Sequence, residues 1–182
     1  MGDANDSDLL RVRRFDAAKD VDAIKQVFRH NIAEEWTKYH DAKYLPNAKR
    51  YIETATTSPD SDFNNIEQIY FESGGFFWVL VTSKDEVVGM TGLEVNTKER
   101  KGELRRMCLF PSIRRKGWGT KLGKLVEEKA KELGLETVFL STPEHGDDVL
   151  QFYSKLGFCD TGQRAPLHGS PIQEVFLEWK VQ

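Results

Sequence analysis

Cysteine is scarce in this chain of 182 residues. The only two cysteines, Cys108 and Cys159, lie far apart and form no C-x-x-C spacing. A disulfide-stabilised framework and a cysteine-based zinc or redox motif are therefore excluded. We expect both thiols to be buried apolar fillers in a reducing compartment.

Long apolar runs and an excess of charge of one sign are also lacking. No stretch approaches the roughly 18 apolar residues that span a bilayer, and the opening MGDANDSDLL lacks the basic and apolar regions of a secretion signal. The 26 basic and 29 acidic residues give a formal charge of −3, which offers no global attraction to nucleic acid or to an anionic membrane. We expect a soluble protein of the cytoplasm or nucleus, without nucleic-acid or membrane partners, in which any anion site is local.

The sequence shows no metal or hydrolase pattern. The four histidines have no ligand spacing, and no G-x-S-x-G sequence is present. Metal-dependent and serine-dependent hydrolysis are therefore unsupported, and we expect no metal.

The length of the chain suits one well-cored domain and is short for two. Residues 1–8 are polar and predict a flexible tail, which leaves residues 9–182 as a single domain. Apolar spacing predicts a strand, two helices, three strands, a helix, a strand, a helix and a strand, in that order. This order indicates an α/β (α+β) protein with a mixed sheet and helices on both faces.

The individual elements are predicted by apolar periodicity and by turn residues. They are a strand at Leu9–Phe15, a helix with Val21, Ile24, Val27, Phe28 and Ile32 on one face, a second helix from Pro46 to about Thr57, a hairpin at Phe76–Ser83 and Val87–Val95, a strand at Glu103–Phe110, a helix from Trp118 to about Leu133, the strand ETVFLSTP, a helix around Val149–Leu156 and the final strand IQEVFLEWKV.

The stretch FPSIRRKGWGTKL, residues 110–122, combines the end of a strand, a basic run and two glycines before a helix. Pro111 ends the strand because it offers no backbone donor, and the start of the next helix supplies N–H groups without internal partners. The helix dipole adds positive charge there, and Gly117 and Gly119 let a bulky anion approach the backbone. The segment therefore predicts an anion-binding turn.

Two familiar phosphate-binding patterns do not fit this turn. A G-x-x-x-x-G-K-[ST] loop placed on Lys124 would need glycine in place of Trp118 and a hydroxyl residue in place of Leu125. A G-x-G-x-x-G fingerprint beginning at Gly117 would need glycine in place of Leu122. A nucleotide P-loop and a dinucleotide fingerprint are therefore excluded.

A third pattern, R-x-x-G-x-G, is met by Arg114, Gly117 and Gly119 and is preceded by the letters L-F-P. About 35 residues further on, FYSKLGF at Phe152–Phe158 forms a second motif. Together, and in this element order, the two motifs resemble those of the GNAT superfamily of N-acetyltransferases, over nearly the whole chain. The resemblance implies a GNAT-like fold with a mixed, mostly antiparallel central sheet of six to seven strands, flanked by helices on both faces.

The resemblance also implies a reaction. A GNAT domain would transfer an acetyl group from acetyl-CoA, its cosubstrate, to a primary amine by direct attack in a ternary complex, without a metal. We expect the acceptor to be a small molecule such as an amino acid or a polyamine, and the protein to be a monomer or homodimer. Two alternatives stay open: a protein lysine or N-terminal acetyltransferase, and a non-catalytic acyl-CoA-binding module.

The coenzyme-binding roles of the family fall on the end of one strand and on the turn that follows it. The backbone of Met107, Cys108 and Leu109 would hold the pantetheine arm, and the N–H of Leu109 would donate to the thioester oxyanion. Arg115 and Lys116 could equally form a solvated charge cluster. The residues implied for the pyrophosphate are Arg114, Arg115, Lys116, Gly117, Trp118, Gly119 and Thr120.

Two side chains match the acid and the base of the family. Tyr153 would protonate the departing thiolate, because a phenol is neutral at pH 7 and carries a proton to give; the alternative is a packing role on its helix. Glu103 would take the proton of the acceptor ammonium, with Glu94 or an ordered water as alternatives. The asparagine that the family often places seven residues before the tyrosine is here Gly146.

The acceptor pocket of the family lies between the link of the first two helices and the loop between the last two strands. The matching segments here are Glu34–Tyr44 and Thr161–Pro171. We expect Trp36, Tyr39 and Arg164 to contact the acceptor, as an aromatic wall for an amine or a cationic clamp for a carboxylate.

Overall fold

The computed structural model describes residues 9–144, 147–167 and 172–182, so the predicted tail at residues 1–8 lies outside the described residues. The helices are α1 (Val21–Tyr39), α2 (Leu45–Thr57), α3 (Trp118–Glu132) and α4 (Asp147–Lys155). The strands are β1 (Arg11–Arg14), β2 (Phe76–Val81), β3 (Val87–Asn96), β4 (Lys101–Leu109), β5 (Thr137–Pro143), β6 (Cys159–Pro166) and β7 (Gln173–Lys180). The predicted element order is confirmed, with one strand added.

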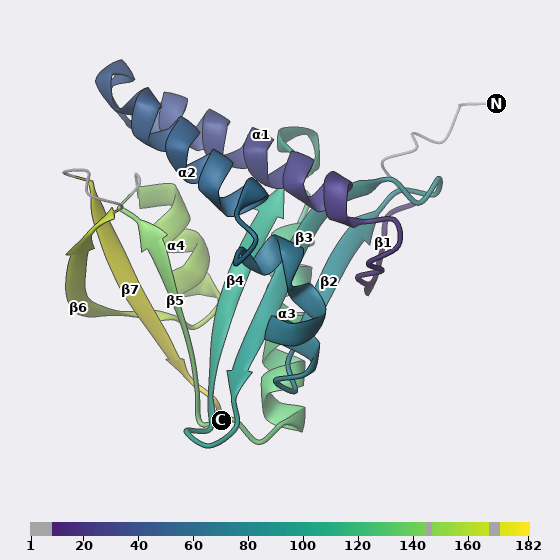
Figure 1. Cartoon of the computed structure of the whole chain (residues 1–182). Coiled ribbons are helices and arrows are strands. Elements are labelled where there is room, and N and C mark those ends of the chain that lie inside the picture. Colours follow the sequence, from purple (N-terminus) through teal and green to yellow (C-terminus); the bar gives the residue numbers. More distant parts are fainter. Residues whose placement is uncertain (1–8, 145–146, 168–171) are drawn as a thin grey trace.

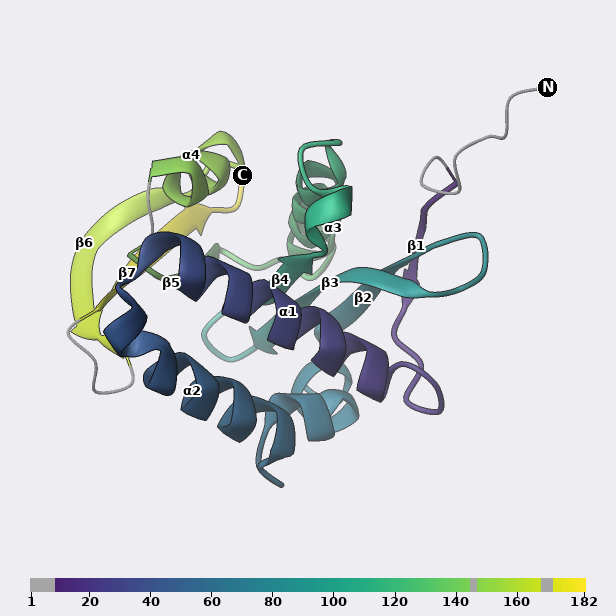
Figure 2. The same ribbon diagram turned by 90° about the horizontal axis from the view of Figure 1, so that it is seen from above.

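The strands form one seven-stranded sheet in the order β1-β2-β3-β4-β5-β7-β6 (Figure 1). Among the described strand pairs only β4 and β5 run parallel. Helices α1 and α2 cover one face and α3 and α4 cover the other, as the view from above shows (Figure 2). The predicted fold class, a mostly antiparallel sheet with helices on both faces, is therefore confirmed.

The added strand is β6, which the apolar pattern did not indicate. Its residues CDTGQRAP carry no apolar alternation, and nearly all of them are exposed because this edge strand pairs only with β7. Arg164 consequently lies in a strand and not in a loop. Cys159 is exposed, so the prediction of a buried thiol is wrong there and confirmed for Cys108.

Helix α1 is longer than its apolar stripe predicted. It continues past Ile32 to Tyr39, because Trp36 lies one turn further on the same face and is 1% exposed. The segment that we expected to link the first two helices is therefore mostly helical. The sequence predicted a loop here because the three aromatic residues of this segment show no clear helical or strand periodicity. Their burial, which would have indicated a helix, is not visible in the sequence.

Each face of the sheet has its own hydrophobic cluster. The cluster under α1 and α2 includes Ile24, Phe28, Phe77 and Met90. The cluster under α3 and α4 includes Leu93, Leu104, Val126, Ala130 and Leu140. The sheet is thus buried on both sides at its centre, where β3 and β4 lie.

Strand β4 separates from β5 after the first third of its length. The two strands are paired only from Lys101 to Glu103 on β4, opposite Thr137 to Phe139 on β5, and they diverge beyond that point (Figure 1). On its other side, β4 has an irregular register with β3 between Met90 and Gly92. The far half of β4 therefore faces β5 across a gap.

Arg106 lies at this irregular point of β4, with a left-handed φ of 57°. Its guanidinium makes two hydrogen bonds of 2.8 and 2.7 Å to the carboxylate of Asp62, whose side chain is 2% exposed. Asp62 also accepts a hydrogen bond of 2.7 Å from the hydroxyl of Tyr70. The guanidinium lies 4.8 Å from the ring centre of Phe28 and 4.6 Å from that of Phe63. These contacts hold the arginine in a conformation that residues with a Cβ rarely adopt.

Replacing Asp62 should therefore lower the stability of the protein far more than replacing an exposed acid does. Asp62→Ala leaves the guanidinium of Arg106 buried without its partner, and we expect the free energy of unfolding to fall by about 3–5 kcal/mol. The matched control is Asp160→Ala, which breaks an exposed pair with Arg164 and should change stability little. Urea denaturation measures both changes, and equal losses for the two variants would contradict the anchoring role of Asp62.

The same carboxylate makes stability depend on pH. Burial alone would raise the pKa of Asp62, but the hydrogen bonds and charge of Arg106 outweigh it and hold that pKa below its usual value. The stabilisation is therefore present above the unfolded pKa of about 3.9 and is lost as the pH falls through the lower folded pKa. We expect the stability difference between wild type and Asp62→Asn to be constant from about pH 5 to 7 and to shrink below about pH 4. Denaturation curves at each pH measure it, and a difference independent of pH would refute this account.

Candidate active site

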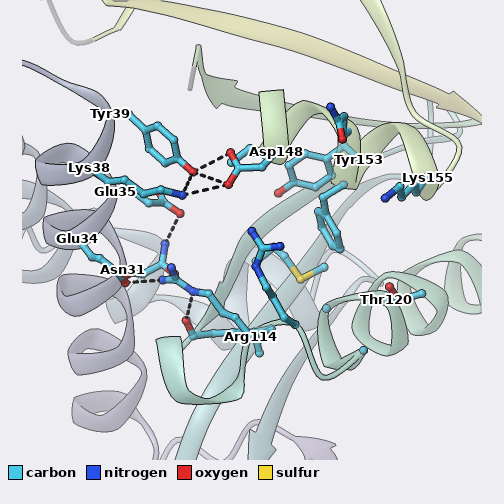
Figure 3. Close-up of a pocket in the computed structure, with 18 residues that line it drawn as sticks. Asn31, Glu34, Glu35, Lys38, Tyr39, Arg114, Thr120, Asp148, Tyr153 and Lys155 are labelled. Carbon is cyan, nitrogen blue, oxygen red and sulfur yellow. Dashed lines mark hydrogen bonds and ion pairs between the residues drawn. The ribbon is translucent and has the colours of Figure 1, made fainter. Parts of the chain in front are cut away.

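A cleft of about 580 Å³ opens where β4 leaves β5. Its walls come from the second half of α1, the end of β4, the turn before α3, the start of α3 and the helix α4 (Figure 3). Of the predicted site residues, Met107, Leu109 and Tyr153 line it, together with Tyr39. The structure also brings to it five residues of the predicted anion-binding turn: Arg114, Arg115, Gly117, Gly119 and Thr120.

The start of α3 presents unpaired backbone donors to this cleft. The first intrahelical hydrogen bond is donated by the N–H of Lys121 to the carbonyl of Gly117, at 3.1 Å, so the N–H groups of Trp118, Gly119 and Thr120 precede the ladder. No side chain among the described residues caps this helix start. Three adjacent donors and the positive end of the helix dipole form an anion site of the size of a phosphate group.

The backbone conformation of the turn explains its sequence. Gly117 has a φ of 82°, in the left-handed region that favours glycine, and Arg115 has a φ of 59°. A Cβ at Gly119 would lie 3.1 Å from the ring of Phe152, and one at Gly123 would lie 2.7 Å from Leu156. The glycines therefore have two different roles. Gly117 allows the chain to turn, and Gly119 and Gly123 let α4 pack directly on α3.

The edge of β4 offers a further donor. The N–H of Phe110 donates to the carbonyl of Val88 on β3, at 3.0 Å. Successive N–H groups of an extended strand point to opposite sides, so the N–H of Leu109 points away from β3, towards the gap that β5 has left. This places a backbone donor where the predicted oxyanion would lie.

Arg114 lies in the cleft wall but is held by protein groups. Its Nε donates to the carbonyl of Leu109 at 3.0 Å, and its Nη2 donates to Oδ1 of Asn31 at 2.9 Å. The same Nη2 lies 3.0 Å from the carboxylate of Glu34. Arg114 thus ties the end of β4 to α1. Lys116, whose side chain is exposed, does not line the cleft.

Tyr153 projects from α4 into the cleft and is 8% exposed (Figure 3). Burial raises the pKa of its phenol above the usual value, and the nearby Cys108 and Glu35 raise it further. Tyr153 is therefore neutral at pH 7 and holds a proton that it can donate. Cys108 itself points into the core under α1, where burial raises the pKa of its thiol to about 12.

Several predicted residues lie elsewhere. Glu103 is at the last paired position of β4, opposite Glu94 on β3, and does not line the cleft. Burial raises the pKa of Glu103, Arg105 lowers it and Glu94 raises it. Trp36 is buried with its ring centre 5.1 Å from that of His40.

Two further predicted residues, Trp118 for its backbone N–H at the pyrophosphate and Arg164 for the acceptor, do not line the cleft with their side chains. The Nζ of Lys121 lies 3.9 Å from the ring centre of Trp118, outside the cleft wall. Arg164, on β6, makes a salt bridge of 2.6 Å with Asp160 and lies 3.9 Å from Glu144. His168 and Gly146 lie outside the described residues.

The structure adds cleft residues that the sequence analysis did not identify. They are Asn31 and Glu35 on α1 and Asp148 opposite them on α4; Asn31 and Glu35 recur every four residues with the predicted Tyr39 and face the cleft beside it. The hydroxyl of Tyr39 donates to the carboxylate of Asp148 at 2.6 Å, and the Nζ of Lys38 lies 3.1 Å from it. The helical spacing was visible in the sequence, but it was overlooked because α1 was predicted to end earlier.

A smaller hollow of about 350 Å³ lies between the end of α2 and β4. Its guanidinium groups are already engaged, because Arg106 binds Asp62 and Arg105 binds Glu94. Within the residues described, no group of three or more His, Cys, Asp and Glu side chains is placed to hold a metal ion. None of the described helices has the length and apolarity needed to cross a membrane.

The model of the acetyltransferase (GNAT) family matches residues 31–158. Among curated proteins, the uncharacterized N-acetyltransferase YjgM of Escherichia coli is 33% identical over 104 residues, which are 56% of this chain and 62% of that protein. N-acetylaspartate synthetase of Xenopus tropicalis is 33% identical over 125 residues, 68% of this chain and 44% of that protein. The matches thus span less than two thirds of the length of these relatives.

Solved structures show the same fold. The PaiA N-acetyltransferase of Thermoplasma acidophilum, in complex with coenzyme A, superposes with a TM-score of 0.73 at 20% identity, over 94% of this chain and 98% of that one. The protein yncA of Salmonella typhimurium, solved with its cofactor acetyl-CoA, superposes with a TM-score of 0.65 at 15% identity, over 95% of this chain and 94% of that one. The match to the family model covers well over half of the chain, and the chain therefore belongs to the GNAT family of acetyltransferases.

Proposed function

We propose that the protein is an N-acetyltransferase that moves an acetyl group from acetyl-CoA to a primary amine within a ternary complex. The observation that carries the proposal is the cleft, where an anion site, an unpaired strand edge and a buried phenol meet. Several relatives are named N-acetyltransferases, and one fold neighbour was solved with coenzyme A. A non-catalytic acyl-CoA-binding module would need the first two features but not the phenol.

The residues of the cleft fit the parts of coenzyme A. The N–H groups of Trp118, Gly119 and Thr120 would bind the pyrophosphate, since such donors favour phosphate oxygens. The edge of β4 from Met107 to Leu109 would pair with the amide groups of the pantetheine arm, because it lacks a neighbouring strand on that side. The basic side chains of the turn contribute less than its amides, because Arg114 is held by Asn31 and Glu34.

Two groups support the chemical step. Attack of an amine on the thioester develops negative charge on the carbonyl oxygen, and the N–H of Leu109 would donate to it. Tyr153 would give its proton to the sulfur as the C–S bond breaks, because a phenol is protonated in neutral solution and Tyr153 projects into the cleft.

The acceptor that suits this cleft best is a small cationic amine. Glu34, Glu35 and Asp148 lie at its α1 end, opposite the anion site. Carboxylates favour a cation, and a cleft that also holds part of the coenzyme has room for an acceptor of the size of an amino acid or polyamine. Tyr39 is the one member of the predicted acceptor-contacting trio that lines this end. A protein lysine or N-terminal acceptor is the alternative.

The anion site can be tested at Gly119. A methyl group there presses on Phe152 and crowds the N–H donors, so we expect Gly119→Ala to weaken coenzyme A binding about tenfold, or about 1.4 kcal/mol. Gly123→Ala is the matched control, because its methyl group meets Leu156 one turn further along and leaves the donors accessible. Calorimetric titration measures both affinities. If Gly119→Ala binds as tightly as Gly123→Ala, the pyrophosphate does not lie on this helix start.

The acid role can be tested at Tyr153. Phenylalanine keeps the ring and its packing against Phe152 and Phe158 but removes the proton. We expect Tyr153→Phe to lower kcat about 10²–10⁴-fold while the KM for acetyl-CoA stays the same. Thiol release with a panel of amines measures this. An unchanged kcat would show that Tyr153 has a packing role only. If wild type binds coenzyme A tightly but releases no thiol with any amine, the non-catalytic module is supported instead.

A further inference from the structure

We propose that Glu35 binds the ammonium group of the acceptor and takes its proton, so that the acceptor enters at the α1 end of the cleft as a cation. This inference rests on the proposed function and adds to it a catalytic base that the sequence motifs did not indicate. Glu35 lines the same cleft as Tyr153, the turn and the end of β4. Glu103 does not, although its position matches the motif.

Glu35 and Tyr153 face one another across the cleft. Glu35 projects from α1 and Tyr153 from α4, and the end of β4 lies between the two helices (Figure 3). The negative charge of Glu35 is close enough to raise the pKa of the Tyr153 phenol and that of the Cys108 thiol. An amine held by Glu35 would therefore approach the reacting carbonyl from the side opposite to the proton donor.

A chain of hydrogen bonds fixes the position of Glu35. The Nδ2 of Asn31 donates to Oε1 of Glu35 at 2.8 Å, and Oδ1 of Asn31 accepts from Nη2 of Arg114 at 2.9 Å. The Nε of Arg114 donates to the carbonyl of Leu109 at 3.0 Å. Asn31 is 5% exposed, and the hydrogen bonds of this chain are partly buried. The carboxylate of Glu35 is thus connected through Asn31 and Arg114 to Leu109, the residue whose N–H points into the gap beside β4.

Several of the charged groups around the carboxylate of Glu35 neutralise one another in part. From α1 itself come Glu34, Lys38 and Tyr39, and from the turn Arg114 and Arg115. Helix α4 contributes Asp148, Tyr153 and Lys155, and β4 contributes the thiol of Cys108. Glu34 is paired with Arg114, and Lys38 is paired with Asp148. Tyr39 and Tyr153 have raised pKa values and stay protonated in neutral solution, first because burial disfavours their charged forms.

The proposed step balances its protons and electrons. The ammonium passes one proton to Glu35, and the lone pair on nitrogen forms the C–N bond to the thioester carbonyl carbon. As the C–S bond breaks, its electron pair goes to sulfur, which takes the proton of Tyr153. Glu35 releases the first proton to water and then takes the second proton from the nitrogen, which it also releases, while the phenolate of Tyr153 regains a proton from water. The products are the amide, the free thiol of coenzyme A and one proton.

The test is the pH dependence of kcat in Glu35→Gln, a variant that keeps an oxygen for Asn31. An acceptor ammonium has a pKa of about 10.4, so at pH 7 it needs a base, whereas at high pH it deprotonates in solution. We expect Glu35→Gln to lose at least about 100-fold in kcat at pH 7 and to recover progressively towards pH 10, with the KM for acetyl-CoA unchanged. Butane-1,4-diamine and lysine serve as acceptors, with thiol release as the readout.

Three comparison variants make the test decisive. Asp22→Asn, on the first turn of the same helix, should behave as wild type. Glu35→Asp keeps a carboxylate and should recover part of the activity at pH 7. Glu103→Gln is the competing variant. If it loses the activity at neutral pH while Glu35→Gln keeps the wild-type profile, Glu103 is the base and this inference is overturned.

The failure of the inference can be told from failure of the proposed function. A wild type that releases thiol with an amine, together with an equally active Glu35→Gln, overturns the inference alone. A wild type that binds coenzyme A but releases no thiol with any amine overturns both. Coenzyme A affinity, measured for every variant, reports whether the cleft is intact, and a tight-binding but inactive Glu35→Gln that recovers at high pH supports the inference.

Discussion

The left-handed conformation of Arg106 is the constraint on which the cleft depends. A residue with a Cβ pays roughly 1–3 kcal/mol for such a conformation, and it persists only where its surroundings compensate. Here the compensation is the buried pair with Asp62, supported by the hydroxyl of Tyr70 and by two phenyl rings. The irregular register at Arg106 places the residues after it beside a gap. The coenzyme binding that we propose at the edge of β4 therefore depends on a buried acid on a distant segment, which holds the strand in this shape.

The cleft is electrostatically divided. Backbone donors and the positive end of the α3 dipole lie at one end, and at the other the carboxylate of Glu35 lies beside the ion pairs Glu34–Arg114 and Asp148–Lys38. A negatively charged donor and a positively charged acceptor would each meet the end that complements it. Tyr153 and the N–H of Leu109 lie between these ends, where the acyl group would be transferred from the donor to the acceptor. The small net charge of the whole chain conceals this local separation.

The sequence predicted the fold, and it indicated the turn whose residues line one side of the cleft, because both depend on local patterns. Pro111, Gly117 and Gly119 each impose a backbone property that shows in the letters, and apolar alternation marks the central strands. The edge strand β6 was missed because a strand exposed on both faces needs no alternation. Arg164 was placed in a loop for the same reason.

The acceptor side was harder to predict because it is assembled from distant segments. Asn31 and Glu35 look like ordinary polar residues of an amphipathic helix, and only the packing of α1 beside β4 and α4 brings them to the cleft. Trp36, by contrast, looked like an exposed aromatic and is buried, since α1 extends through it. The network around Asp62 was equally invisible, because its partner on β4 is 44 residues away along the chain.

The network around Asp62 also depends on Gly92, a residue that bears no functional group. A methyl group at Gly92 would lie 2.6 Å from Cε1 of Tyr70, whose hydroxyl binds Asp62. Any larger residue at Gly92 must displace the tyrosine, and with it the acid that holds Arg106. The four positions Asp62, Tyr70, Gly92 and Arg106 are therefore coupled, so the cost of a substitution at one of them depends on which residues occupy the other three.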